Sequence, residues 1–216
     1  MKNQEPKAKN LPLLKVCGLT QMKQIEKLIS WNVDFLGFIF YEKSPRYVLK
    51  HLSLEEISEI NHQGKVGVFV NECIEKIIEI SEKANLNYIQ LHGDEDDKFI
   101  KNLRKKINPK IQLIKVFRIG NKVPTIVPQP PEVDYLLFDT DSQAFGGTGK
   151  TFEWGFLNTL SIEKPYFLSG GISLENIENL NILDQKPFAV DINSKFETEA
   201  GIKDLQKIRL FLDIKF

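Results

Sequence analysis

Reactive side chains stand at the ends of several apolar runs in this 216-residue chain. A cysteine ends the first run at Cys17, a histidine ends the fourth at His92, and an aspartate ends the sixth at Asp139. Thiol, imidazole and carboxyl groups are among the side chains that give and take protons in catalysis. If the runs are strands whose ends meet at one edge, Cys17 and Asp139 are candidates for proton transfer, and His92 is expected to line the site without a proton-transfer role.

Other polar residues follow the remaining runs and suit the binding of an anionic substrate. A guanidinium matches a carboxylate in two parallel hydrogen bonds, and glycines let backbone N–H groups approach a phosphate closely. The candidate binding residues are Arg46, Gly170, Gly171, Asp191, Asn193 and Ser194.

The elements that would position these residues alternate along the chain. Most of the apolar runs are continuous, which is typical of parallel strands buried on both faces. The eight runs cover residues 13–17, 34–40, 65–70, 87–92, 111–117, 134–139, 165–169 and 187–192. Segments with apolar residues at helical spacing lie at 21–31, 53–62, 73–84, 95–105, 173–183 and 203–213. Ser53 followed by Glu56 indicates a capping box at the start of the second helix.

This alternation predicts the α/β class and a single (β/α)8 TIM barrel over residues 11–216, rather than an open doubly wound sheet. Residues 1–10 are expected to be a disordered lead-in. The segment GNKVPTIVPQPPEV after the fifth strand contains four prolines, so a loop is expected in place of the fifth helix. In such a barrel the active site lies at the carboxyl ends of the strands.

Composition argues against several kinds of partner. Lys and Arg total 29, as do Asp and Glu, so no net field attracts nucleic acid. The two cysteines offer neither a disulfide framework nor a metal-binding motif, which favours a reducing cytoplasm and no metal site. No apolar stretch approaches the ~18 residues of a membrane span, and the polar start is unlike a signal peptide.

A set of motifs spread along the chain gives a more specific indication. From about Leu13 to the C-terminus the sequence resembles the phosphoribosylanthranilate isomerase family. The motifs that carry the resemblance are KVCGLT (15–20), GFIFYEKSPRYV (37–48), VGVFVNE (66–72), IQLHGDE (89–95), LLFDT (136–140), FGGTGKTFEW (145–154), LSGGIS (168–173) and VDIN (190–193).

The resemblance implies a cofactor-free barrel enzyme of L-tryptophan biosynthesis, an isomerase of the aldose–ketose type. It would convert N-(5'-phosphoribosyl)anthranilate to 1-(2-carboxyphenylamino)-1-deoxyribulose 5-phosphate by an Amadori rearrangement. By resemblance Asp139 is the general acid, Cys17 the general base, and Arg46 the residue that holds the anthranilate carboxylate, while His92 lines the site. Asp139 would need burial to keep its proton, and Cys17 a partly open, electropositive setting to ionise.

The substrate phosphate is expected at the loops after the seventh and eighth strands. Gly170 and Gly171, placed before a predicted helix start at Ser173, form one half of the phosphate site, and Asp191 is expected to position the substrate. In the other half the chain has Asn193-Ser194-Lys195 where the family has Ser-Ser-Gly. The loss of glycine could change the loop shape, and Lys195 could add a positive charge near the phosphate.

Several alternatives remain open at the level of sequence. Residues 144–151 read AFGGTGKT, close to a nucleotide-binding P-loop, but the segment fits a mobile lid over the barrel mouth better because no strand precedes it directly. A kinase would also need a second, metal-holding motif. The chain could instead be another ribose-phosphate barrel enzyme, or a barrel that binds a phosphorylated ligand without turnover. A monomer and a homodimer fit the sequence equally.

Overall fold

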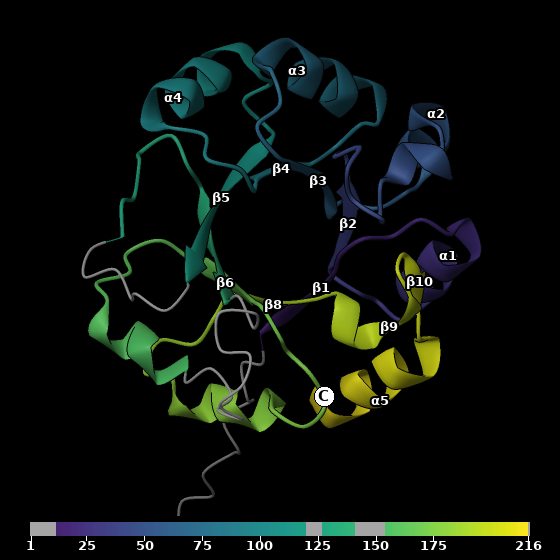
Figure 1. Cartoon of the computed structure of the whole chain (residues 1–216), viewed down its shortest axis with the longest axis vertical. Coiled ribbons are helices and arrows are strands. Elements are labelled where there is room, and N and C mark those ends of the chain that lie inside the picture. Colours follow the sequence, from purple (N-terminus) through teal and green to yellow (C-terminus); the bar gives the residue numbers. More distant parts are fainter. Residues whose placement is uncertain (1–11, 120–126, 141–153, 216) are drawn as a thin grey trace, which may run out of the picture.

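Parallel strands close into a barrel at the centre of the molecule (Figure 1). The computed structural model describes residues 12–119, 127–140 and 154–215. Within them each strand pairs with the next one in the sequence, and the eighth pairs with the first. The barrel strands are β1 (Leu13–Val16), β2 (Phe35–Ile39), β3 (Lys65–Phe69), β4 (Tyr88–Leu91), β5 (Gln112–Ile119), β6 (Tyr135–Thr140), β7 (Tyr166–Ser169) and β8 (Ala189–Ile192). The TIM-barrel prediction is therefore confirmed.

Helices surround the strands as an outer ring (Figure 1). The α-helices are α1 (Met22–Ser30), α2 (Leu54–Glu59), α3 (Ile74–Lys83), α4 (Asp97–Lys106) and α5 (Leu205–Lys215). Short 3₁₀ helices are η1 (Val48–Lys50), η3 (Trp154–Thr159), η4 (Ile177–Ile182) and η5 (Ser194–Phe196). A small antiparallel pair, β9 (Glu197–Glu199) and β10 (Ile202–Lys203), precedes α5 and was not predicted from the sequence.

The strands bury both of their faces, which explains why they are continuous apolar runs. Side chains alternate between the two faces of a strand, so one set fills the barrel and the other meets the helices. The inner set includes Phe35, Val66, Ile114, Leu137 and Phe167. The outer set includes Leu14, Val16, Leu36 and Phe38. Both sets are buried, and the barrel is therefore filled below its mouth.

The predicted start of the second helix is confirmed in atomic detail. The Ser53 hydroxyl accepts a hydrogen bond from the backbone N–H of Glu56 at 3.1 Å, and the Glu56 carboxylate accepts one from the N–H of Ser53 at 2.7 Å. These reciprocal bonds satisfy two donors that a helix start leaves unpaired. The capping box therefore fixes where α2 begins after the loop from β2.

The prediction of a helix over residues 173–183 is wrong in its type and its start. A turn takes its place up to Asn176, and only the 3₁₀ helix η4 follows. Asn176 accepts a hydrogen bond from the N–H of Ser173 at 2.8 Å and donates one to the carbonyl of Gly171 at 2.9 Å. Asparagine side chains compete with helical backbone bonds in this way, and the segment contains three of them.

Other predictions fall on segments that the structure does not describe. The lead-in at 1–10 and the glycine-rich segment at 145–152, with its lid and P-loop interpretations, lie outside the described residues. The proline-rich loop stays a prediction, because residues 120–126 also lie outside, although residues 127–134 contain no helix. No helix in the described part of the chain is both long and apolar enough to cross a membrane.

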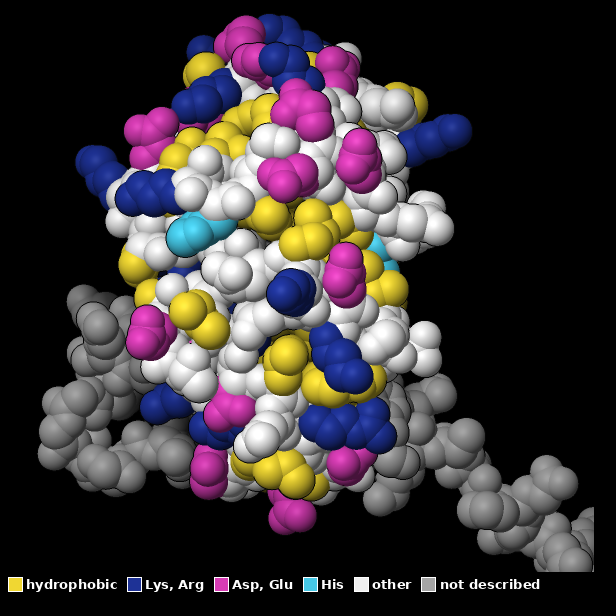
Figure 2. Space-filling model, turned by 90° about the vertical axis from the view of Figure 1, so that its right-hand side faces the viewer, with side chains coloured by type: hydrophobic (Ala, Val, Ile, Leu, Met, Phe, Trp, Pro, Cys, Tyr) yellow, Lys and Arg dark blue, Asp and Glu magenta, His cyan; other side chains and the backbone are white. Residues whose placement is uncertain are grey.

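Charges of both signs are mixed over the face that carries α1 and α2. In Figure 2 lysines and arginines alternate with aspartates and glutamates on this face, with apolar side chains between them. This mixture fits the equal totals of acidic and basic residues in the sequence. On this face no broad patch of one charge is presented to a polyanion.

Candidate active site

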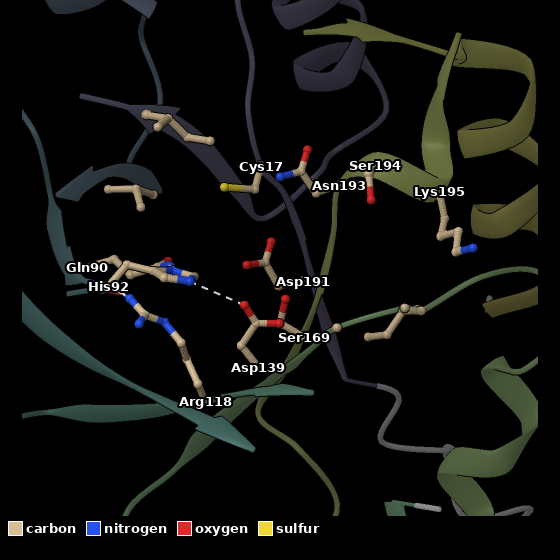
Figure 3. A pocket seen from close by; sticks show the side chains of 15 residues that line it. Cys17, Gln90, His92, Arg118, Asp139, Ser169, Asp191, Asn193, Ser194 and Lys195 are labelled. Atoms are coloured by element: carbon tan, nitrogen blue, oxygen red, sulfur yellow. Dashed lines mark hydrogen bonds and ion pairs between the residues drawn. The ribbon is translucent and has the colours of Figure 1, made fainter. Parts of the chain in front are cut away.

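A cavity of about 390 Å³ opens at the carboxyl ends of the barrel strands. Figure 3 shows side chains from several strands turned into it. Among the residues that line it are most of those proposed from the sequence: Cys17, His92, Asp139, Gly170, Gly171, Asp191, Asn193 and Ser194. Arg46 does not line the cavity. The residues predicted from the strand ends therefore line one cavity, with the exception of Arg46.

Strand register explains why these residues meet. Asp139 on β6 is the register partner of Ser169 on β7, and Lys15 on β1 is the partner of Asp191 on β8. Registered partners on parallel strands share a face, and a residue two positions further along a strand returns to that face. Cys17 follows Lys15 by two residues, so its thiol also points into the barrel mouth (Figure 3).

Asp139 contacts His92, and Gln90 holds the other nitrogen of the histidine ring. Its Oδ2 lies 3.2 Å from Nε2 of His92, while Nδ1 of His92 lies 2.9 Å from Nε2 of Gln90. A ring nitrogen that accepts from the Gln90 amide leaves the ring proton on Nε2, where it is donated to Asp139. The Asp139 side chain remains 28% exposed, which differs from the burial expected for it from the sequence.

Cys17 is buried rather than partly open, contrary to the expectation. It is 5% exposed, and this burial raises the pKa of its thiol above the usual value of 9.0. The cations of Lys15 and Lys203 act in the opposite direction, and the carboxylate of Asp191 adds to the rise. The electropositive neighbours are therefore present, but burial outweighs them. A Cβ at Gly37 would lie 2.8 Å from the sulfur, so glycine makes room for the thiol.

Beneath the thiol lies a buried ion pair. Nζ of Lys15 is 2.7 Å from Oδ2 of Asp191, and the side chains are 0% and 5% exposed. Although burial lowers the pKa of Lys15, Asp191 and Cys17 raise it above 10.5, so the lysine stays charged. The second oxygen of Asp191, Oδ1, is buried with no hydrogen-bond partner among the described residues. A buried acceptor of this kind needs a donor from a ligand or from water.

Replacing Lys15 with methionine is expected to destabilise the fold by about 3–5 kcal/mol, because it leaves the Asp191 carboxylate buried without a counter-charge. Denaturant unfolding measures this change. The double variant Lys15→Met, Asp191→Leu removes both charges and should recover much of the loss. A cost below about 1 kcal/mol for the single variant would show that the pair does not constrain the barrel.

Arg46 is held in an ion-pair network beside the cavity. Its Nε and Nη2 donate to the Glu197 carboxylate at 2.9 and 2.6 Å, and Glu197 is only 4% exposed. Lys203 donates to the same carboxylate at 2.6 Å and to Asn193 at 2.9 Å. Although burial raises the pKa of Glu197, Arg46 and Lys203 hold it below its usual value. The network ties the loop after β2 to β9 and β10.

The loops after β7 and β8 form one wall of the cavity. Gly170 and Gly171 have φ angles of +85° and +71°, a range that favours glycine. The backbone conformation therefore explains the two glycines of the LSGGIS motif. After β8 the chain enters η5 at Ser194, and Lys195 does not adopt a positive φ. Lys195 therefore needs no left-handed backbone at this position, and it lines the cavity.

Gln90 and Arg118 are among the cavity residues that were missed in the sequence. Gln90 precedes His92 by two positions on β4, and Arg118 follows Val116 by two on β5, so both point inward. The alternation of side chains along each strand is the signal that could have found them. No group of three or more potential metal-ligating side chains occurs within the described ranges.

Comparisons with known proteins identify the family of the chain. The family model described as "N-(5'phosphoribosyl)anthranilate (PRA) isomerase" matches residues 14–214. An N-(5'-phosphoribosyl)anthranilate isomerase of Parabacteroides distasonis is 38% identical over 205 residues, covering 93% of this chain and 91% of the relative.

Solved structures agree as well. Monomers generated from the dimeric phosphoribosylanthranilate isomerase of Thermotoga maritima match with a TM-score of 0.70 and 27% identity, covering 94% and 97% of the two chains. An isomerase in complex with reduced 1-(o-carboxyphenylamino)-1-deoxyribulose 5-phosphate matches with a TM-score of 0.69 and 27% identity, covering 94% and 97%. The family model over nearly the full chain and the 38% identical relative show that the chain belongs to the phosphoribosylanthranilate isomerase family of tryptophan biosynthesis.

Proposed function

We propose that this chain carries out the isomerisation by acid–base catalysis, with Asp139 as the acid and Cys17 as the base. The observation that carries the proposal is that both side chains line one cavity from different strands (Figure 3). A mouth of about 390 Å³ has room for one phosphorylated sugar with an aromatic ring. The two groups can therefore act on the same bound molecule.

Each group would move one proton. Asp139 gives its proton to the ring oxygen of the ribose as the bond from that oxygen to C1' breaks, which leaves a Schiff base between C1' and the nitrogen. The thiolate of Cys17 then takes the proton from C2', the electrons of that C–H bond form a C1'–C2' double bond, and the electrons of the second C1'–N bond of the protonated Schiff base move onto nitrogen. The resulting enolamine becomes the ketose when its hydroxyl loses a proton and C1' gains one. Proton transfer by positioned groups typically contributes about 10²- to 10⁴-fold.

Buried acceptors in the cavity suit the hydroxyl groups of a ribose. Oδ1 of Asp191 and Oε1 of Gln90 are buried and have no hydrogen-bond partner within the described residues. Both residues line the cavity. An unpaired buried acceptor costs about 1–3 kcal/mol, so sugar hydroxyls that donate to these atoms gain affinity and a fixed orientation. This supports Asp191 as a residue that positions the substrate, and Gln90 joins it.

The phosphate would lie against the loops after β7 and β8. Gly170, Gly171, Asn193, Ser194 and Lys195 all line the cavity. Barrel enzymes commonly bind phosphate at these two loops. The exposed Lys195 supplies a positive charge at this loop. His92 lines the site and contacts Asp139. The expected contact of Arg46 with the substrate carboxylate stays a prediction, and Nη1 is the part of its guanidinium that Glu197 does not engage.

The ionisation of Cys17 tests its role as a base. Since burial raises the pKa of this thiol, the thiolate fraction should be small at pH 7 and should increase through and above pH 9. Alkylation of Cys17 by iodoacetamide, followed by mass spectrometry in a Cys73→Ser background, measures that titration. Its midpoint should lie above 9 and move higher in Lys15→Met, because the lysine cation lowers the thiol pKa. A midpoint below 8.5 would contradict this description of the thiol.

Assembly, cofactor use and location complete the proposal. We propose a monomer or homodimer in the cytoplasm that needs no cofactor and binds neither nucleic acid nor membrane. The dimeric relative from Thermotoga maritima supports the homodimer. Cys17 and Cys73 are both free, which fits a reducing compartment.

A further inference from the structure

Lys203 is a buried cation that the proposed acid–base steps do not use. Its side chain is 0% exposed, and it lies on β10, in the small β9–β10 hairpin that precedes α5. Nζ donates to Oε1 of Glu197 at 2.6 Å and to Oδ1 of Asn193 at 2.9 Å. Because Asn193 lines the cavity, Lys203 connects this hairpin to the active site.

The β9–β10 hairpin is held against the segment that follows β1, beside α1 (Figure 1). The side chain of Gln24 accepts a hydrogen bond from the backbone N–H of Lys203 and donates one to its carbonyl, both at 2.8 Å. The hydroxyl of Thr20 donates to the carbonyl of Gly201 at 2.6 Å. These bonds fix the backbone of β10, so the position of the Lys203 side chain is fixed as well.

Lys203 determines which way the amide of Asn193 faces. An ammonium group has only donors, so the Asn193 atom that it contacts must be the oxygen, and the NH2 group lies at the other end. In Figure 3 that nitrogen is the end turned toward Cys17. The amide also packs against the residue after the cysteine, since a Cβ at Gly18 would lie 2.9 Å from Oδ1 and 3.5 Å from Nδ2 of Asn193. A hydrogen-bond donor is therefore presented on the side of the thiol.

Charged groups on β1, β8 and β10 act on the Cys17 thiol. Burial raises the pKa of this thiol, Lys15 lowers it, and Asp191 raises it further. Lys15 and Asp191 form an ion pair at 2.7 Å, so together they carry no net charge. Lys203 also lowers the thiol pKa. Stabilisation of a thiolate in this buried place therefore depends on the charge that Lys203 contributes.

The cluster around Lys203 has an excess of positive charge. Lys203 and Arg46 both contact the carboxylate of Glu197, so two positive charges face one negative charge. Although burial raises the pKa of Glu197, the two cations hold it below its usual value, and the carboxylate stays ionised. Burial lowers the pKa of Lys203, but a lysine 2.6 Å from an ionised carboxylate keeps its proton near neutral pH. Arg46, in the loop after β2, also interacts electrostatically with Cys17.

We propose that Lys203 is a positioning residue for the base: from β10 it turns the amide N–H donors of Asn193 toward Cys17 and holds a positive charge there, so that a thiolate can form in a buried cavity. The inference rests on the proposed role of Cys17 as the base. It gives the β9–β10 hairpin a task in the reaction, because the hairpin carries Lys203 to this place.

The pH dependence of Cys17 alkylation tests the proposal in the absence of substrate. Iodoacetamide and mass spectrometry give the midpoint in a Cys73→Ser background for the unaltered site and for Lys203→Met, Asn193→Ala and the double variant Lys203→Met, Glu197→Gln. Lys203→Met leaves the buried Glu197 carboxylate with one partner fewer, which can prevent folding. The double variant removes that carboxylate charge as well and keeps the test decisive.

Lys65→Met is the matched control. This lysine is also buried, at 1% exposed, and its Nζ donates to the backbone carbonyls of Ile57 and Ser58. It does not line the cavity. Its loss should destabilise the fold and leave the alkylation midpoint of Cys17 unchanged.

Lys203→Met should raise the alkylation midpoint by about 1 unit, the low end of the effect of a neighbouring charge, and the double variant should do the same. Asn193→Ala should raise it by less, because the charge of Lys203 remains. In turnover at pH 7, kcat of Lys203→Met should fall about 10-fold with little change in KM, since each unit of pKa changes the thiolate fraction about tenfold. At pH 8 this variant should reach the wild-type kcat of pH 7.

An unchanged midpoint in folded Lys203→Met or in the double variant would overturn the proposal, and so would an equal rise in Lys65→Met. A kcat of Lys203→Met that does not recover with pH would assign Lys203 a purely structural role. Full turnover by Cys17→Ser would instead overturn the proposed base itself. That result is distinct, because it comes from another variant and does not depend on the midpoint measured for Lys203→Met.

Discussion

Asp139→Asn should lower kcat by at least ~10²-fold while the barrel stays folded. Asparagine has almost the same shape, and its oxygen can still accept the hydrogen bond from Nε2 of His92, which lies 3.2 Å from the carboxylate in the native chain. It cannot deliver a proton to the ring oxygen of the ribose, so only the chemical step is removed. Initial rates of loss of substrate fluorescence, measured at saturating phosphoribosylanthranilate, give the change in kcat.

The matched control is Asp213→Asn, since Asp213 is an exposed carboxylate on α5 whose partner is Arg209. This control should keep the wild-type rate, and circular dichroism with thermal unfolding shows whether each variant is folded. A folded Asp139→Asn protein with normal kcat would rule out Asp139 as the acid and would direct attention to His92.

Cys17→Ser is expected to cost at least ~10²-fold in kcat as well. Serine fits the space that Gly37 leaves for the side chain, but its hydroxyl does not ionise near neutral pH, so C2' keeps its proton. The loss should appear in kcat more than in KM, because the substrate contacts remain. Single-turnover rates with the wild-type and variant proteins measure the proton-transfer step directly.

The second cysteine supplies the control for this prediction. Cys73 is exposed and directly precedes α3, outside the cavity lining, so Cys73→Ser should leave the rate unchanged. Full activity in a folded Cys17→Ser protein would exclude the thiol as the base. Lys15, directly beneath it in the barrel, would then be the next group to examine.

The barrel could be predicted because its strands obey simple rules. A parallel strand buried on both faces is largely apolar along its length, as in FLGFI of β2, and such runs stand out in a sequence. The start of helix α2 could be predicted equally well, because the side chains of Ser53 and Glu56 each accept a hydrogen bond from the backbone N–H of the other residue. The structure of residues 173–183 was predicted wrongly. Their apolar residues have helical spacing, but the side chain of Asn176 forms local hydrogen bonds that compete with a helix.

The sequence predicted the position of the site better than its electrostatics. Strand ends located Cys17, His92, Asp139 and Asp191, because the carboxyl ends of all strands meet at one mouth. The burial of Cys17 and the pair of Arg46 with Glu197 depend on residues far apart in the sequence; the latter two are 151 positions apart. Local patterns carry no information on such contacts, whereas the inward alternation on β5 is a local signal that could have indicated Arg118.

The most direct test of the account is turnover of freshly generated phosphoribosylanthranilate by the purified chain, with a chelator present and no nucleotide added. Acid–base catalysis by Asp139 and Cys17 predicts rapid loss of the anthranilate-type fluorescence with the wild-type chain and none above background with Asp139→Asn. No loss above the uncatalysed rate with a folded wild-type chain would contradict the account. It would instead support a barrel that binds a phosphorylated ligand without converting it.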